Sequence, residues 1–261
     1  MNRAAFAALT GAVAGMLATK SLAAAPQGTS RVAMVVYPGM TALDMIAPQL
    51  IFAGLGKTDV QLVWKDRQTV VSDTGVPIVP TQTFDDVADG LTVLFVGGYG
   101  GAEAFSVMND PHVVRFLQRV GPSAEYVTSV CTGALILGGA GLLRGYRATT
   151  HWDFRDVLAT LGATPVAERV VVDRNRITGA GVTAGLDFGL TMAAKLRGED
   201  HARLLQLLFE YDPKPPFDAG SEATAGENIG RQARAVFTSL VASAKANAAI
   251  AGERLALGGH Q

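Results

Sequence analysis

The sequence contains a single cysteine, Cys131, among its 261 residues. This scarcity excludes an intramolecular disulfide and any zinc site built from several cysteines. The four histidines (His112, His151, His201 and His260) lie far apart, without the short spacings of metal-binding motifs. We therefore expect no bound metal.

Charged side chains are also scarce, at 17% of the residues, and neither sign dominates. The 22 Lys and Arg residues against 23 Asp and Glu give a net charge of −1. Nucleic-acid binding normally requires a basic surface, so we expect no nucleic-acid partner. The hydrophobic content, 49%, is too high for a disordered chain. A chain of this length can bury a core without disulfides.

The first 25 residues have the features of a secretory signal peptide. Arg3 precedes an uncharged apolar stretch at 4–18, and small residues follow at 21–25. This order predicts cleavage near 23–25. The apolar stretch is short for a membrane span, and no twin arginine is present. We expect a Sec-exported protein, periplasmic or secreted, that leaves the membrane after cleavage. An uncleaved disordered tail is the alternative.

Runs of apolar residues alternate with segments of helical periodicity through the rest of the chain. Apolar, β-branched runs predict strands at 31–37, 60–65, 91–96, 126–130, 170–173 and 176–179, and a short hairpin at 69–79. Helical spacing predicts helices at 41–55, 111–120, 132–143, 153–161, 183–196, 201–209 and 224–248. This alternation predicts an α/β fold, with a mostly parallel sheet and helices on both faces. We expect one domain over 31–250, with fraying after about residue 252.

Cys131 follows a predicted strand directly and precedes a predicted helix. A residue at such a corner sits on a tight, strained turn at the end of the sheet where ligands bind in α/β folds. The helix N-terminus would lower the pKa of the thiol and supply thiolate at neutral pH. The alternative is a buried cysteine that serves as a small apolar side chain.

Two other strand ends carry candidate site residues. Gly97 and Gly98 end the strand at 91–96, where glycine permits close backbone approach. The N–H groups of Gly98 and Thr132 could form an oxyanion hole, although an ordinary glycine turn is also possible. Asp44 lies among apolar residues, so burial would raise its pKa and favour proton transfer. A helix-capping role is the alternative.

Several segments together resemble the DJ-1/ThiJ/PfpI superfamily, the class I glutamine amidotransferase-like proteins. They are YPGMTALDMIAP (37–48), GGYG (97–100), YVTSVCTGALILGGAGLLRGYRATTHW (126–152), ERVVVDRNRITGAGVTAGLDF (168–188) and LFEYDPKPPFDAGS (208–221). The Pro-rich segment and the surroundings of Asp44 are most similar to the isonitrile hydratase branch. The resemblance extends from residue 31 to the last helix.

This resemblance implies a flavodoxin-like three-layer sandwich, a homodimer, no cofactor and a small-molecule substrate. It implies Cys131 as the nucleophile, Asp44 as the general acid and base, and Thr132 as a supporting residue. The implied reaction is the hydration of an isonitrile to an N-substituted formamide, by a lyase of the hydro-lyase type. Thr132 stands where PfpI-like peptidases have histidine, which argues against peptidase activity.

Other functions of the same fold stay open at this point. One is a different cysteine-dependent hydrolase or glyoxalase-like enzyme acting on small electrophiles. Another is redox sensing through Cys131. A third is the ligand-sensing half of a transcription regulator, although few residues follow the Pro-rich segment. We expect the segment 149–152, which matches the family, to border the site, with His151 in a structural role. We expect Asp187 to hydrogen-bond the glycine-rich turn before it.

Overall fold

The computed structural model describes residues 28–258, and a seven-stranded sheet lies at their centre. The predicted signal peptide, 1–25, lies outside these residues. The strand order is β10-β11-β7-β6-β1-β2-β5. The strands are β1 (Ser30–Val35), β2 (Thr58–Trp64), β5 (Gln82–Thr83), β6 (Val93–Val96), β7 (Tyr126–Val130), β10 (Val170–Asp173) and β11 (Arg176–Gly179). All neighbours are parallel except β10 and β11.

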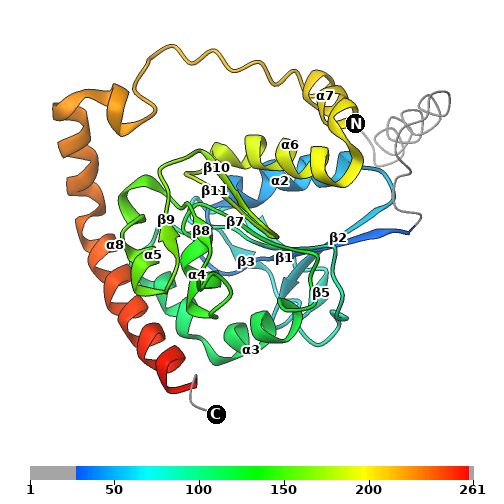
Figure 1. Ribbon diagram of the computed structural model, residues 1–261, viewed down its shortest axis with the longest axis horizontal. Coiled ribbons are helices and arrows are strands. Elements are labelled where there is room, and N and C mark those ends of the chain that lie inside the picture. The colour runs from blue at the N-terminus through cyan, green and yellow to red at the C-terminus, as the bar shows by residue number, and fades with distance from the viewer. Residues whose placement is uncertain (1–27, 259–261) are drawn as a thin grey trace.

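Helices cover both faces of the sheet (Figure 1). One layer contains α2 (Ala42–Gly54), α6 (Ala184–Arg197) and α7 (Glu199–Leu208), which pack on one another. The other contains the 3-10 helix η1 (Ala102–Asn109), α3 (Pro111–Val120), α4 (Gly133–Gly139) and α5 (Val157–Thr160). The predicted three-layer α/β sandwich is therefore confirmed.

Short elements complete the architecture outside the main sheet. The pairs β3 (Val70–Val71) with β4 (Pro77–Ile78) and β8 (Arg147–Ala148) with β9 (Thr164–Pro165) each form a two-stranded ladder. The first is the predicted hairpin at 69–79, and it is antiparallel. A second 3-10 helix, η2 (Trp152–Phe154), precedes α5.

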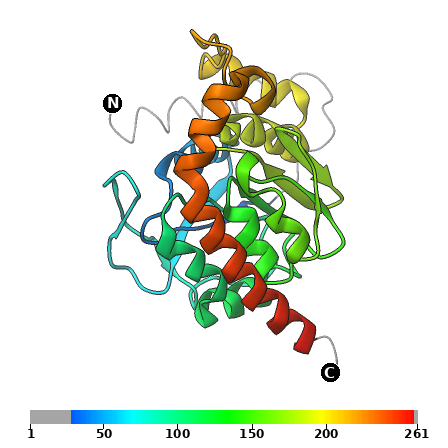
Figure 2. The same ribbon diagram turned by 90° about the vertical axis from the view of Figure 1, so that its left-hand side faces the viewer.

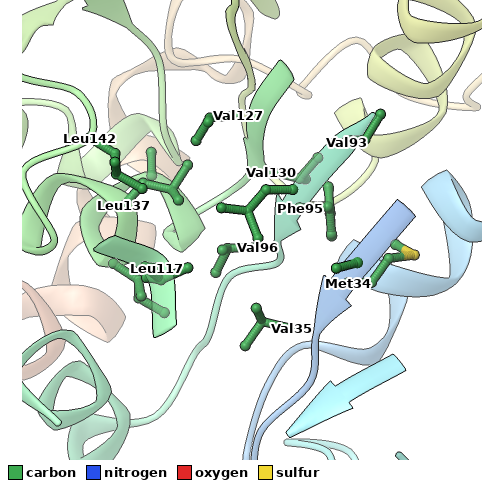
Figure 3. Packing of buried hydrophobic residues seen from close by; sticks show 14 of the residues in the cluster. Met34, Val35, Val93, Phe95, Val96, Leu117, Val127, Val130, Leu137 and Leu142 are labelled. Atoms are coloured by element: carbon green, nitrogen blue, oxygen red, sulfur yellow. The ribbon is translucent and has the colours of Figure 1, made fainter. Parts of the chain in front are cut away.

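The central strands are buried on both sides, which explains their unbroken apolar sequences. All residues of Val32–Val35 and Val93–Val96 are buried. Figure 3 shows side chains of β1, β6 and β7 meeting Leu117 of α3 and Leu137 of α4. The core thus fixes the carboxyl ends of β1, β6 and β7 relative to one another, and the candidate site lies at those ends.

Two predicted helices are shorter than expected. The segment predicted at 132–143 is helical only from Gly133 to Gly139, and Gly141 adopts a left-handed conformation with φ +82°. A left-handed residue ends an α-helix, and glycine adopts it without strain. The segment at 153–161 divides into η2 and α5.

The last helix, α8 (Glu222–Gly258), is longer than predicted and bends at Gly226, where φ is +76°. It lies across one side of the molecule (Figure 2). The predicted fraying after residue 252 is wrong up to Gly258, because Arg254 donates to Asn109 Oδ1 and to the Gly139 carbonyl, each at 2.7 Å. Residues Glu222–Ala256 are long and apolar enough to cross a membrane. In this structure Ala244 and Ala248 of this helix are fully buried.

Gly133 allows a direct test of how closely α4 must approach the sheet. A Cβ at Gly133 would lie far inside van der Waals distance of the Val96 carbonyl oxygen, a main-chain atom that cannot move aside. We expect Gly133→Ala to lower the free energy of unfolding by about 1–3 kcal/mol, measured in urea. Gly230→Ala is the matched control, because it lies in α8 with open space around it. This control should gain up to about 1 kcal/mol. Equal effects of the two changes would contradict the interpretation.

Candidate active site

Cys131 stands on a strained turn between β7 and α4. Its φ of +57° is in the left-handed region, which costs a non-glycine residue about 1–3 kcal/mol. Neighbouring segments hold the turn on both sides. The N–H of Cys131 donates to the carbonyls of Gly179 (3.1 Å) and Ala180 (2.8 Å). The Thr150 hydroxyl donates to the Cys131 carbonyl at 2.8 Å. The observed conformation agrees with the turn predicted from the sequence.

Asp44 lies in the first turn of α2 and is completely buried. Its Oδ2 accepts the N–H of Gly98 at 2.7 Å. The capping alternative is wrong, because the N-cap position of α2 belongs to Thr41 and the Asp44 carboxyl reaches across to the loop after β6. Burial raises the pKa of the Asp44 carboxyl from 3.8 to about 7. The predicted rise in its pKa is confirmed.

The thiol of Cys131 lies beside this carboxyl, and each group changes the proton affinity of the other. Burial and the negative charge of Asp44 raise the pKa of the Cys131 thiol well above its ordinary value. The main-chain N–H groups of Thr132 and Val182 donate to the sulfur and act in the opposite direction. The expectation of a free thiolate at neutral pH is therefore wrong for this environment. Two buried anions in contact repel each other, so the pair retains one proton that both groups compete for.

Gly98 is the residue on which this close packing depends. A Cβ at this position would lie 2.5 Å from Thr132 N, 2.7 Å from Asp44 Oδ2 and 2.7 Å from Cys131 Cβ. Gly97 is packed less tightly than Gly98, because a Cβ added at Gly97 would be 3.3 Å from Asp44 Cβ. The two predicted oxyanion donors already have partners: Gly98 N–H binds Asp44, and Thr132 N–H binds the sulfur. Their role as oxyanion donors stays a prediction.

The side chain of Thr132 fixes the loop that follows β6. Its hydroxyl accepts the Tyr99 N–H at 2.7 Å and donates to the Tyr99 carbonyl at 2.9 Å. Gly97 is held from the other side, since the buried Tyr37 hydroxyl donates to its carbonyl at 2.8 Å. The structure thus brings all five predicted site residues together: Asp44, Gly97, Gly98, Cys131 and Thr132.

The sequence analysis gave no role to two contributors, Tyr37, which ends a predicted strand, and Val182. Thr150 lies in the segment 149–152 that was expected to border the site, and its bond to Cys131 agrees with that expectation. The Val182 contact is made by a main-chain N–H, so its residue type carries no signal. For Tyr37 the available signal was a hydroxyl at the end of an otherwise apolar strand.

Two further residues weighed in the sequence have their described contacts with groups other than Asp44 and Cys131. Asp187 pairs with Arg169 (2.7 Å) and Tyr211 (3.0 Å), so the expected bond to the glycine-rich turn is wrong. His151 packs its ring against Trp152, Phe154 and Phe237, and burial lowers its pKa to about 4. No group of three or more His, Cys, Asp or Glu side chains within residues 28–258 could hold a metal ion.

Comparison with known proteins identifies the family. Residues 30–195 match the DJ-1/PfpI family. The chain belongs to this family. The crystal structure of a ThiJ/PfpI family protein from Pseudomonas syringae superposes with a TM-score of 0.83 at 44% identity, covering 89% of this chain and 99% of that one.

Two curated relatives of this chain differ from each other in their described function. Isonitrile hydratase from Pseudomonas putida is 48% identical over 204 residues, which are 78% of this chain and 88% of that protein. The HTH-type transcriptional regulator GbdR of Pseudomonas aeruginosa is 31% identical over 150 residues, but these are only 39% of the regulator.

The proton balance of the pair predicts how the reactivity of Cys131 depends on pH. Below pH 7 both groups are protonated and the sulfur is a neutral thiol. As the pH rises through about 7 the pair loses its first proton, and the negative charge that this loss creates becomes available to the sulfur. Alkylation by iodoacetamide, measured by intact mass on this single-cysteine chain, should therefore accelerate through about pH 7. In Asp44→Asn that step should disappear. A step at the same pH in this variant would contradict the assignment.

Proposed function

We propose that this protein is a cysteine-dependent hydratase that converts isonitriles to N-substituted formamides, and thus a lyase of the hydro-lyase type. The observation that carries the proposal is the buried pair of Asp44 and Cys131, whose side chains are hydrogen-bonded to each other and whose pKa values burial raises. The 48% identity to an isonitrile hydratase over most of the chain supports this substrate class.

An isonitrile suits such a pair for a chemical reason. Its terminal carbon accepts both a nucleophile and a proton, so its hydration needs a thiolate and an acid at the same place and time. Two independent groups with ordinary pKa values would rarely be in those two states together at neutral pH. A pair that retains one proton supplies both once the proton lies on Asp44. The charge is then on the sulfur, where the N–H groups of Thr132 and Val182 stabilise it.

In the first step, the Cys131 thiolate attacks the isonitrile carbon. Asp44 donates its proton to the same carbon and becomes a carboxylate. The product is a thioimidate, R–N=CH–S–Cys131, which contains all the atoms of the isonitrile and the thiol. Covalent attachment divides one difficult hydration into easier steps.

In the second stage, water adds to the thioimidate carbon and gives its proton to Asp44. Asp44 passes that proton to the nitrogen, which leaves R–NH–CH(OH)–S–Cys131. The C–S bond then breaks as the hydroxyl oxygen forms a carbonyl and its proton returns to Asp44. The formamide R–NH–CHO departs, and the thiolate and the carboxylic acid are restored.

The two oxygens of Asp44 differ in a way that fits this role. Oδ2 is held by Gly98 N–H, whereas Oδ1 is buried and has no regular hydrogen-bond partner among the described residues. A buried carboxyl oxygen without a partner favours the protonated acid. We therefore assign the transferred proton to Oδ1.

A cysteine hydrolase of another specificity would use the same two side chains, so the substrate test below separates the two functions.

Replacement of either reactive group should abolish turnover. We expect Cys131→Ala and Asp44→Asn to lower kcat/KM for simple isonitriles by about 10³-fold or more, read as formamide formation. Cys131→Ser should fold and remain nearly inactive, because a serine hydroxyl is not ionised in this range. Val236→Ala, at an exposed position of α8, is the control and should match the wild type. Substantial turnover by Cys131→Ala would rule out the covalent mechanism. A folded wild type that turns over no isonitrile would favour another small electrophile.

We also propose that the mature protein is an exported homodimer. Support for export comes from the N-terminal sequence pattern alone. Support for the dimer is the exposed apolar pair Leu43 (46%) and Ile46 (44%) on the outer side of α2, next to Asp44.

Expression of the full chain with cell fractionation should yield periplasmic protein whose intact mass places its first residue at 24–26. Sedimentation of that protein should give twice the monomer mass, and Leu43→Asp should reduce the measured mass to that of one monomer. Full-length cytoplasmic protein would overturn the first proposal, and a monomeric wild type the second.

A further inference from the structure

The reactive pair is enclosed, so the position of the substrate's organic part is not given by the pair itself. Cys131 is 4% exposed and Asp44 is 0% exposed. A cavity of about 430 Å³ lies nearby, lined by Pro38, Gly39, Trp64, Tyr99 and Val107. This volume is within the usual range of small-molecule pockets, about 300–1,000 Å³.

Tyr99 connects this cavity to the reactive pair. Both its N–H and its carbonyl are bound by the hydroxyl of Thr132, the residue after Cys131. The residue before it, Gly98, donates to Asp44. The cavity wall is therefore one residue from the main-chain atoms that position both reactive groups.

The ring of Tyr99 occupies a defined position between two glycines. A Cβ at Gly39 or at Gly101 would overlap atoms of the ring, so larger residues at either position would displace it. The ring also packs against Tyr37, with centroids 6.3 Å apart, and against Phe105, at 6.4 Å. The sequence thus provides space for this side chain on both sides and holds it there with aromatic neighbours.

The lining offers an apolar surface to a neutral group, beside polar residues that include Ser106. Trp64, Tyr99, Pro38 and Val107 supply its surface, and the two charged lining residues, Lys65 and Asp110, pair with each other. A second cavity of about 460 Å³ adjoins Trp152, but Glu222, Glu227, Arg231 and Arg234 line it. Glu222 and Arg234 of this second cavity pair with each other, so the charges of its lining do not distinguish it from the first. The cavity beside Tyr99 is favoured by its position, because its wall adjoins the residues that hold Asp44 and Cys131.

We propose that the cavity beside Tyr99 binds the organic substituent of the substrate, and that Tyr99 is the specificity-determining residue that separates this cavity from Cys131. The proposal rests on the hydratase function and specifies its substrate class as isonitriles with neutral apolar substituents of about the size of a benzyl group. A methyl substituent would leave most of the cavity unfilled and gain little binding from it.

Filling the cavity tests its role. We expect Val107→Trp to lower kcat/KM for benzyl isonitrile by about tenfold or more relative to that for methyl isonitrile, because the added indole takes the space of the substituent. The matched control is Val236→Trp, which adds the same side chain at an exposed position of α8 and should leave the ratio unchanged. An unchanged ratio in Val107→Trp would overturn the proposal.

Substitution of Tyr99, which forms a wall of the cavity, tests its role in substrate specificity. Tyr99→Ala should reduce the preference for benzyl over methyl isonitrile by about tenfold, whereas Tyr99→Phe, which retains the ring, should keep most of it. Loss of the preference in both variants, or in neither, would contradict a role for the ring. Circular dichroism and the urea midpoint of each variant establish that it is folded.

Alkylation of Cys131 separates this proposal from the hydratase function. Because the chain has one cysteine, intact mass reports its reaction directly. Val107→Trp should slow N-benzylmaleimide about tenfold more than iodoacetamide, whether or not any isonitrile is hydrated. If the wild type hydrates no isonitrile but this selective slowing occurs, the cavity assignment stands and the proposed reaction fails. If Phe237→Trp, beside the second cavity, produces the selective slowing instead, the route lies on that side and the proposal is wrong.

Discussion

The structure depends on one electrostatic constraint: a carboxyl and a thiol are buried side by side where only one negative charge can be held. Burial raises the pKa of both Asp44 and Cys131, and the negative charge of Asp44 raises that of the thiol further, whereas the hydrogen bond from the thiol lowers that of Asp44. The surrounding main chain is arranged around that single charge. Gly98 N–H faces the carboxylate, while the N–H groups of Thr132 and Val182 face the sulfur. Each tautomer of the pair therefore finds donors in place, and moving the proton requires no rearrangement of the backbone.

Such proximity requires a backbone conformation that an isolated chain would avoid. Cys131 is held in the left-handed region by β11 on its N–H side and by Thr150 on its carbonyl side. Glycines at 98 and 133 then permit the loop after β6 and the start of α4 to approach within distances that no side chain would tolerate. The strain is local, whereas the bonds that maintain it come from strands and loops far apart in the sequence. A folded sheet is therefore a precondition for the reactive pair.

The sequence predicted those features that depend on local pattern. The buried strands follow from unbroken apolar runs, and the strained corner at Cys131 follows from its place between a strand and a helix. The sequence failed where the outcome depends on distance in space. A helix N-terminus alone would favour thiolate, but burial and the neighbouring Asp44 carboxylate together outweigh a seven-residue helix. The contacts of Tyr37 and the Val182 N–H were missed because their partners lie 60 and about 50 residues away.

The C-terminal helix supports the site from outside the region of the family match. The family match ends at residue 195, so α8 lies beyond it. Yet Arg254 of α8 binds Asn109 and the Met108 carbonyl of η1, and Asn109 donates to the Asn247 carbonyl. These bonds fix the helix that carries Val107, one wall of the cavity beside Tyr99. Substitutions of Arg254 or Asn247 can therefore change the shape of that cavity while Asp44 and Cys131 keep their positions, since the reactive pair is held by β7, β11 and the loop after β6. In this arrangement the reactive pair belongs to the region of the family match, and one wall of the cavity beside Tyr99 is fixed in part by a helix outside that region.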